Sequence, residues 1–231
     1  MAGQNFRGFA EKVALVTGGA HGMGRAVALQ LALEGAFVVI QHAKGDYRAV
    51  EVVNELQALG TIALGAEGDV CSWEGVTQVF GIVEMAYGRL DLLVNVFDEW
   101  RPGSIVETSD EEWQAAIGSG LDGAFLCCKA AERLMKQRPS AAIVNMFYSG
   151  HETGVESSVT GVVNAAGIAA LTKVLAVQLK PKIRVNAVEV CGRIGERPAN
   201  DDIARASVYL LSGEAKAVSG QTVRVGESKN G

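Results

Sequence analysis

Short, uniformly apolar runs alternate along the chain with longer segments of helical spacing, and this alternation constrains the fold more than any other feature. The strand-like runs cover residues 12–18, 36–42, 61–70, 90–96, 141–147, 183–190 and 221–227. The helix-like segments cover residues 24–35, 46–60, 73–88, 109–137, 158–180 and 200–212. Strands that are apolar on both faces predict a parallel sheet with helices on both sides.

Length and composition exclude several classes of protein. The 231 residues contain no linker, repeat or low-complexity segment, so we expect one domain over residues 1–231. A net charge of -5 argues against a general nucleic-acid-binding surface. We see no signal-peptide pattern and no apolar run that approaches the roughly 20 residues of a membrane span. The four cysteines show neither metal-ligand nor disulfide spacing, so we expect a cytoplasmic protein without a metal.

A glycine-rich turn, TGGAHGMG at residues 17–24, joins the first strand to the first helix. Gly18 suits a tight turn, Gly22 a close backbone approach, and Gly24 close packing of helix on strand. The N–H groups and partial positive charge of the helix N-terminus then face outward. In this context the pattern predicts a site for the diphosphate of a dinucleotide.

Several ordered motifs resemble the short-chain dehydrogenase/reductase family over nearly the whole chain. They include the glycine turn, GDV at 68–70, LLVN at 92–95, IVN at 143–145, AGIAALTK at 166–173 and IRVNAV at 183–188. The resemblance implies a Rossmann-type, doubly wound sheet of seven parallel strands, in dimers or tetramers built through the fourth and fifth helices. It also implies cofactor contacts from Gly18, His21, Gly22, Gly24, Asp69, Val70 and Asn95.

The family's Asn–Ser–Tyr–Lys set is missing at the matching positions. The tyrosine of that set transfers a proton, the lysine lowers its pKa, the serine orients the substrate, and the asparagine supports a water relay. Here these four positions hold Gly120, Tyr148, Gly161 and Ala165, and Ser149 replaces the serine only with a one-residue slip.

Other departures concern the cofactor and the substrate. Phe97 and Asp98 stand where the family has Ala and Gly, and are expected to crowd a dinucleotide. Roughly twenty residues of a substrate loop are missing before the last helix, so water is poorly excluded. Because position 42 holds no acid for the ribose hydroxyls, while His21 and Lys44 suit a 2′-phosphate, NADP is favoured over NAD.

Three functions remain open at this stage. The first, and preferred, is a non-catalytic binding, scaffolding or regulatory homologue that pairs with itself or with an active relative. The second is a non-redox enzyme, such as an isomerase, dehydratase or cyclase, that uses Asp98, Tyr148 and His151 on a small molecule. The third is an atypical NADP-dependent reductase with Tyr148 as the proton donor.

Overall fold

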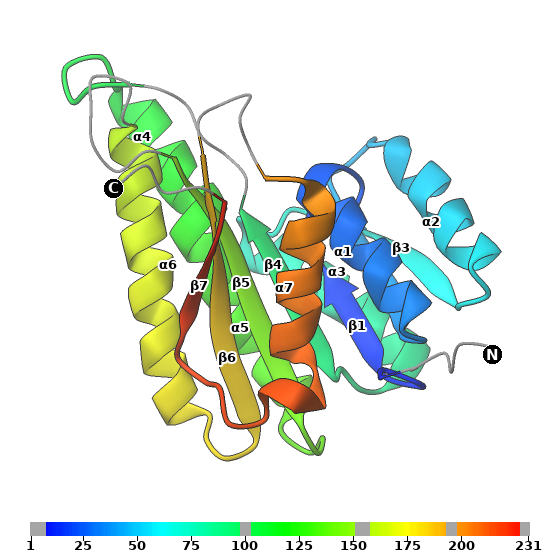
Figure 1. The fold of residues 1–231 in the computed structure, drawn as a ribbon. Coiled ribbons are helices and arrows are strands. Elements are labelled where there is room, and N and C mark those ends of the chain that lie inside the picture. The colour runs from blue at the N-terminus through cyan, green and yellow to red at the C-terminus, as the bar shows by residue number, and fades with distance from the viewer. Residues whose placement is uncertain (1–7, 98–102, 151–157, 193–197, 227–231) are drawn as a thin grey trace.

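Seven parallel strands form one sheet in the order β3-β2-β1-β4-β5-β6-β7 in the computed structural model (Figure 1), which describes residues 8–97, 103–150, 158–192 and 198–226. The expected seven-stranded, Rossmann-type sheet is confirmed. The strands are β1 (Val13–Val16), β2 (Phe37–His42), β3 (Ala63–Glu67), β4 (Leu92–Phe97), β5 (Ala141–Gly150), β6 (Ile183–Cys191) and β7 (Thr222–Val225).

Helices cover both faces of the sheet, as the apolar strands predict. One core cluster joins the sheet to α1 (Gly22–Leu33), α2 (Arg48–Ala58) and α7 (Asn200–Leu211). The other face carries α3 (Trp73–Tyr87), α5 (Gly123–Met135) and α6 (Val159–Gln178). Strands buried on both sides fix the register, because a slip of one residue would exchange the two faces.

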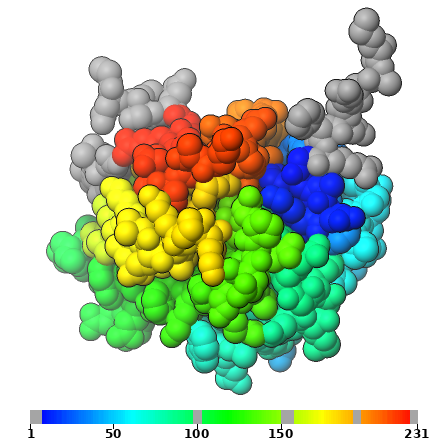
Figure 2. All heavy atoms as spheres, turned by 90° about the horizontal axis from the view of Figure 1, so that it is seen from below, coloured from blue at the N-terminus to red at the C-terminus, as the bar shows by residue number. Residues whose placement is uncertain are grey.

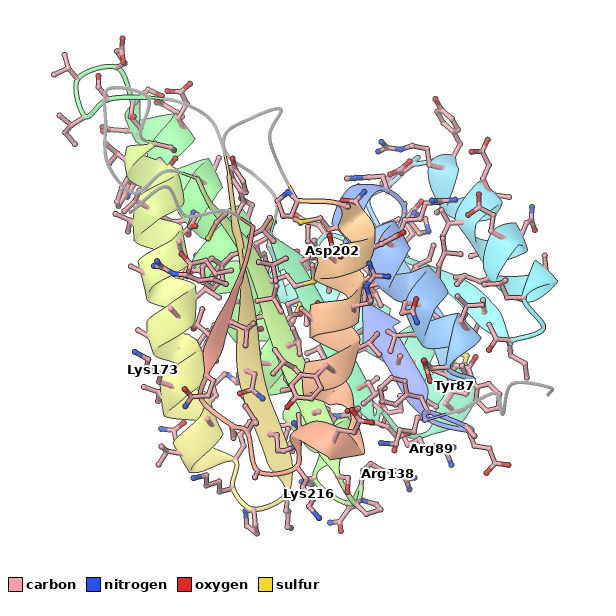
Figure 3. All side chains as sticks on the ribbon, viewed as in Figure 1. Tyr87, Arg89, Arg138, Lys173, Asp202 and Lys216 are labelled. Atoms are coloured by element: carbon pink, nitrogen blue, oxygen red, sulfur yellow. The ribbon has the colours of Figure 1, made fainter. Side chains whose placement is uncertain are left out.

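β1 and β4 are parallel neighbours at the centre of the sheet. From β1 the chain adds β2 and β3 on one side, and it then crosses over to add β4 to β7 on the other side. Ligands of open parallel sheets bind at such a point, beyond the carboxyl ends of the strands, which lie at the top of Figure 1. Figure 2 shows the opposite end, where the end of α6 lies beside the segment that precedes β7. Arg138, which Figure 3 labels at this end, donates from its Nε to Asp91. Asp91 also accepts from Val13 N, so this end serves the fold.

The helical spacing predicts one long helix over residues 109–137, and the structure divides it. α4 (Asp110–Ile117) begins after Ser109, whose Oγ caps the helix by accepting from Glu112 N. A π-helical turn, Gly118–Asp122, then separates α4 from α5. The carboxamide of Asn164 bonds to this turn, which is a recognised cause of a break in a helix.

The expectation that no apolar run approaches membrane-spanning length needs correction. α6 has 20 residues and is long and apolar enough to span a membrane by length and composition alone. It nevertheless packs on β5 and β6, and it buries Gly161, Ala165, Ile168, Thr172 and Ala176. Its buried side therefore belongs to the sheet, while its outer side remains apolar.

Candidate functional site

A cavity of about 170 Å³ lies at the carboxyl ends of β1, β2, β4 and β5. Its wall is mostly apolar, with a few amide, hydroxyl and thiol groups. The lining residues are Gly18, Gln41, Val70, Cys71, Val96, Phe97, Ser119, Gly120, Phe147, Tyr148, Gly161, Asn164, Ala165 and Ile168. The cavity thus spans the glycine turn and the four positions, 120, 148, 161 and 165, that the sequence analysis compared with the family's catalytic set.

The glycine turn forms a backbone cradle beside this cavity. Gly18 and Gly22 have φ of 59° and 52°, and a Cβ on Gly24 would lie 2.2 Å from the Gly18 carbonyl oxygen. His21, the residue before α1, makes no side-chain hydrogen bond to the first turn of the helix. The first N–H groups of α1 therefore fit the oxygens of a diphosphate.

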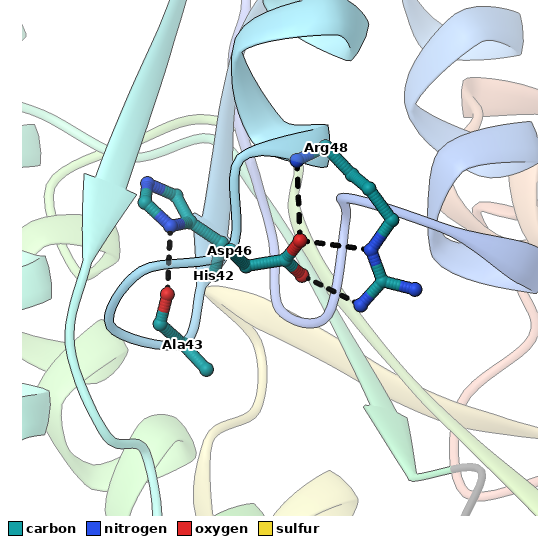
Figure 4. Close-up of polar contacts among 4 residues, drawn as sticks. All are labelled: His42, Ala43, Asp46 and Arg48. Atoms are coloured by element: carbon teal, nitrogen blue, oxygen red, sulfur yellow. Dashed lines mark hydrogen bonds and ion pairs between the residues drawn. The ribbon is translucent and has the colours of Figure 1, made fainter.

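The end of β2 presents an amide to the cavity rather than an acid. Gln41 Oε1 accepts from Gly18 N at 2.8 Å, and Gln41 Nε2 donates to the Gly68 carbonyl at 2.7 Å. The His42 ring turns toward β3, and its Nδ1 lies 3.0 Å from the Ala43 oxygen (Figure 4). Gln41 thus ties the glycine turn to β2 and to the end of β3.

The turn after β2 holds its own carboxylate. Arg48 Nε and Nη2 donate to the two oxygens of Asp46, each at 2.8 Å (Figure 4). These charge-assisted bonds lower the pKa of Asp46. Arg48 thus compensates Asp46, and Lys44 shares the turn with the Glu67 carboxylate, which accepts from Gly45 N at 3.3 Å.

The two predicted contacts after β3 are placed differently. Val70 lines the cavity, whereas Asp69 Oδ1 accepts from Cys71 N at 2.9 Å and so shapes the turn before α3. Ser72 then caps α3 by accepting from Gly75 N. Asp69 thus holds Val70 and Cys71 at the rim.

The side chain of Asn95, predicted to contact the cofactor, lies in a buried polar chain instead. Its Nδ2 donates to Asn145 Oδ1 at 2.9 Å and lies 3.5 Å from Cys128 Sγ, and Asn145 Nδ2 donates to Thr172 Oγ1. Burial raises the pKa of the Cys128 thiol to about 12. The chain joins β4 and β5 to α5 and α6 beneath the cavity, so the Asn95 side chain does not support the predicted contact.

Two phenylalanine rings fill the end of the cavity near α6. Phe97 and Phe147 share a small core cluster with Ala165 and Ile168. A Cβ on Gly123 would lie 3.4 Å from the Phe97 ring, which is 9% exposed. The ring therefore takes up volume beside Ala165, and its expected crowding of a dinucleotide stays a prediction.

Tyr148 is the one member of the proposed acid–base group that the structure describes. Its ring is buried and lines the cavity, and its hydroxyl donates to the Gly192 carbonyl oxygen. Asp98 and His151, together with Glu99, Trp100 and Glu152, lie outside the described residues. Whether the three groups converge therefore stays a prediction.

A β-bulge re-aims the residues next to Tyr148. The pairing of β5 with β6 shifts between Tyr148 and Gly150, which leaves Ser149 as the extra residue. Ser149 Oγ lies 3.7 Å from Cys191 Sγ, and Glu189 pairs with Arg224 at 2.8 Å. None of these side chains is among the described residues that line the cavity. In the part of the chain that the structure describes, no three His, Cys, Asp or Glu side chains form a metal site.

Sequence reasoning missed Gln41, Ser119 and Asn164 as parts of the site. Gln41 follows an apolar run at the end of a strand, which is a usable signal. Asn164 lies among small apolar residues of a helix, where a lone amide has no local hydrogen-bonding role. Its meaning depends on a partner 43 residues away in the chain.

Comparisons with known proteins agree with this geometry. A family model described as Enoyl-(Acyl carrier protein) reductase matches residues 18–194. A 3-oxoacyl-(acyl-carrier-protein) reductase FabG from Staphylococcus aureus is 31% identical over 239 residues, which cover 93% of this chain and 96% of the relative. A 3-oxoacyl-(acyl-carrier-protein) reductase from Synechocystis is 34% identical over 178 residues, covering 77% and 72%.

Solved structures show the same fold over nearly their full length. A short chain dehydrogenase from Burkholderia cenocepacia in complex with NADP has a TM-score of 0.88 and 25% identity, and covers 99% of this chain and 100% of its own. A dehydrogenase/reductase from Sinorhizobium meliloti has a TM-score of 0.88 and 26% identity, covering 96% of each chain.

These relatives contradict the preferred interpretation of the chain as a non-catalytic homologue. The curated relatives are named reductases, and they align with this chain over nearly all or most of its length. The residues at positions 120, 148, 161 and 165 therefore do not establish a loss of catalysis.

Proposed function

Because the chain belongs to the short-chain dehydrogenase/reductase family, we propose that it is an NADP(H)-dependent oxidoreductase that interconverts a carbonyl and an alcohol on a small molecule. The glycine cradle with the open N-terminus of α1 carries this proposal. Named reductases among the relatives and the NADP complex of a structural neighbour support it. The cofactor, when bound, supplies or accepts the hydride.

The described residues suit NADP better than NAD. The backbone N–H groups of Gly22 and Gly24 at the start of α1 would hold the diphosphate, and Val70 would lie against the adenine half. His42 and Gln41 offer no carboxylate to the ribose hydroxyls. Lys44 is exposed in the adjoining turn and suits a 2′-phosphate.

The proton-transfer step would use a different side chain from that of the family. With glycine and alanine at 161 and 165, Tyr148 and Cys71 are the titratable groups among the described residues that line the cavity. The Tyr148 hydroxyl donates to the Gly192 carbonyl oxygen, so it would have to leave this bond to give its proton to a substrate oxygen. Asp98 and His151 remain proposed members of the same site. We also propose that roughly twenty residues of a substrate loop are missing, which leaves the site more open to water.

Titration of the protein with NADPH and NADH, followed by nicotinamide fluorescence, tests the cofactor. NADPH is expected to bind more tightly than NADH, and no binding at about millimolar NADPH overturns the proposal. A 3-oxoacyl thioester is the first substrate to assay, because two relatives are named for it. Tyr148→Phe is expected to lower kcat by about 100-fold or more, with an unchanged Kd for NADPH, whereas the exposed Tyr209→Phe keeps full activity.

We propose further that a second copy of the chain covers the outer faces of α5 and α6, which lie within the expected fourth and fifth helices, residues 109–137 and 158–180. Val163, Val174 and Val177 on α6 are 41%, 51% and 71% exposed, and Phe125 on α5 is 47% exposed. Exposed apolar groups on two adjacent helices favour a self-complementary interface. Sedimentation of the wild type should show a dimer or tetramer, and Val174→Glu should yield monomers. A monomeric wild type would contradict the proposed self-association. The alternative partner for this face is then an active relative of the same family.

A further inference from the structure

Asn164 inserts its side chain into the helix on the opposite wall of the cavity. Its Nδ2 donates to the Ala116 carbonyl at 2.8 Å, and its Oδ1 accepts from Leu121 N at 3.1 Å. In a regular α-helix these two backbone groups would bond to residues four positions away, Gly120 and Ile117. The carboxamide therefore bridges a carbonyl and an N–H five residues apart, which is the spacing of a π-helical turn.

Gly120 makes this insertion sterically possible. A Cβ on Gly120 would lie 2.5 Å from Asn164 Oδ1, 2.6 Å from Cγ and 2.8 Å from Nδ2. All three distances are far shorter than van der Waals contact, so the carboxamide occupies the volume that a side chain at position 120 would need. A carboxamide is thus present at this point of the wall, and it comes from α6 rather than from the α4–α5 segment.

The opened turn forms part of the cavity. Ser119, Gly120 and Asn164 all line it, and Ser119 Oγ donates to the same Ala116 carbonyl at 3.2 Å. These groups make a polar strip on a wall that is otherwise formed by apolar side chains such as Ile168. The position of this strip depends on the turn staying open.

We infer that Asn164 is a positioning residue, which holds the π-helical turn open and so fixes Ser119 and Gly120 against the substrate. This inference rests on the proposed oxidoreductase function. Without the carboxamide, the Ala116 carbonyl and the Leu121 N–H lose the side chain that bridges them, so the turn is no longer held in its opened shape. Because α5 is anchored by the buried Cys127 and Cys128, the change would fall on residues 118–122.

The two bonds require both a donor and an acceptor, which makes the choice of side chain testable. Aspartate keeps the acceptor toward Leu121 N but sets a charged oxygen against the Ala116 carbonyl. When its carboxyl group is protonated, the O–H again donates to that carbonyl. Asn164→Asp should therefore be impaired when ionised and restored as the pH falls through its pKa.

The experiment measures NADPH oxidation with the 3-oxoacyl thioester, and NADPH binding, for a set of variants. At about pH 8, Asn164→Asp is expected to lower kcat by about 10-fold or more with an unchanged Kd for NADPH, and to regain activity relative to the wild type near pH 5. The exposed Asn54→Ala on α2 is the control and should match the wild type. If Asn164→Asp does not fold, Asn164→Ala carries the comparison at a single pH.

An exchange of the two side chains gives the sharpest result. Gly120→Asn alone should clash with Asn164 and lose activity, and Asn164→Gly alone should lose the bridge. The double variant G120N/N164G relieves the clash, but its carboxamide starts within the turn and cannot bridge Ala116 and Leu121 from α6, so it should stay as impaired as Asn164→Gly. Wild-type activity in Asn164→Asp at every pH, or wild-type activity in the double variant, would overturn the inference.

Hydrogen exchange of the Leu121 amide distinguishes failure of the Asn164 inference from failure of the proposed oxidoreductase function. If the wild type neither binds NADPH nor turns over, the oxidoreductase proposal fails, and exchange alone judges Asn164. Exchange at Leu121 should be about 10-fold or more faster in Asn164→Leu than in the wild type. Equal exchange in the two proteins would show that the carboxamide does not hold the turn.

Discussion

The glycine turn after β1 and the pocket wall between β4 and α6 lie at the same edge of the sheet, but they are built from different parts of the chain. The turn is made of backbone: a close contact at Gly24, an open helix N-terminus and the amide of Gln41 on Gly18 N. The wall is made of side chains, with Phe97 and Phe147 packed beside Ala165. The backbone of the glycine turn follows the family's pattern, whereas the wall holds Gly161 and Ala165 at positions where the sequence analysis expects ionisable side chains.

The comparison first predicts that the glycine turn is the less tolerant region. Gly24→Ala would place a Cβ 2.2 Å from the Gly18 oxygen, a backbone atom that cannot move away. Its free energy of unfolding should fall by about 3 kcal/mol or more, and NADPH binding should be lost. Gly81→Ala, in open space within α3, should gain up to about 1 kcal/mol from helix propensity. Urea unfolding of both variants measures this, and equal stabilities would refute the tight contact.

In the pocket wall, a substitution should lower the stability of the protein while it strengthens the binding of NADPH. Phe97→Ala removes a buried ring, so we expect about 3 kcal/mol of lost stability. The same change widens the cavity beside Ala165, so NADPH should bind more tightly to this variant than to the wild type. Phe97→Leu should lie between the two proteins in both measurements. Weaker NADPH binding to Phe97→Ala would show that the ring supports the cofactor site and does not crowd it.

The contrast also explains how much the sequence could predict. The strands and most helices were found within a few residues, because strand burial and helical spacing are local signals. The glycine turn was found because its pattern follows a strand and opens a helix. The π-helical turn, the polar chain around Asn95 and the Gln41 contact were missed, since each depends on residues 23 to 50 positions apart in sequence.

Beneath the wall, the buried polar chain predicts a pH dependence of stability. The pKa of Cys128 is raised from its ordinary value near 9 to about 12, so the folded state keeps its proton while the unfolded chain loses it. Stability from this group is full below pH 9 and falls by about 1.4 kcal/mol per pH unit between those values. Relative to Cys128→Ser, the wild type should thus lose about 2 kcal/mol by about pH 10.5. An unchanged difference in urea midpoint would mean that water reaches the thiol.

The smallest effect is expected at the rim of the glycine turn, where the charge of the 2′-phosphate distinguishes NADPH from NADH. Lys44 lies in the exposed turn after β2, and the neighbouring Asp46 is neutralised by Arg48 (Figure 4). Lys44→Ala should weaken NADPH binding by about 5-fold, the scale of one exposed charge pair, and leave NADH binding unchanged. Added salt should remove most of the difference, because the pair is exposed to solvent. Lys216→Ala, at the opposite end of the molecule (Figure 3), is the matched control and should leave both affinities unaltered. An equal loss of NADPH and NADH would instead place Lys44 near the shared diphosphate, and would extend the backbone cradle by one side chain.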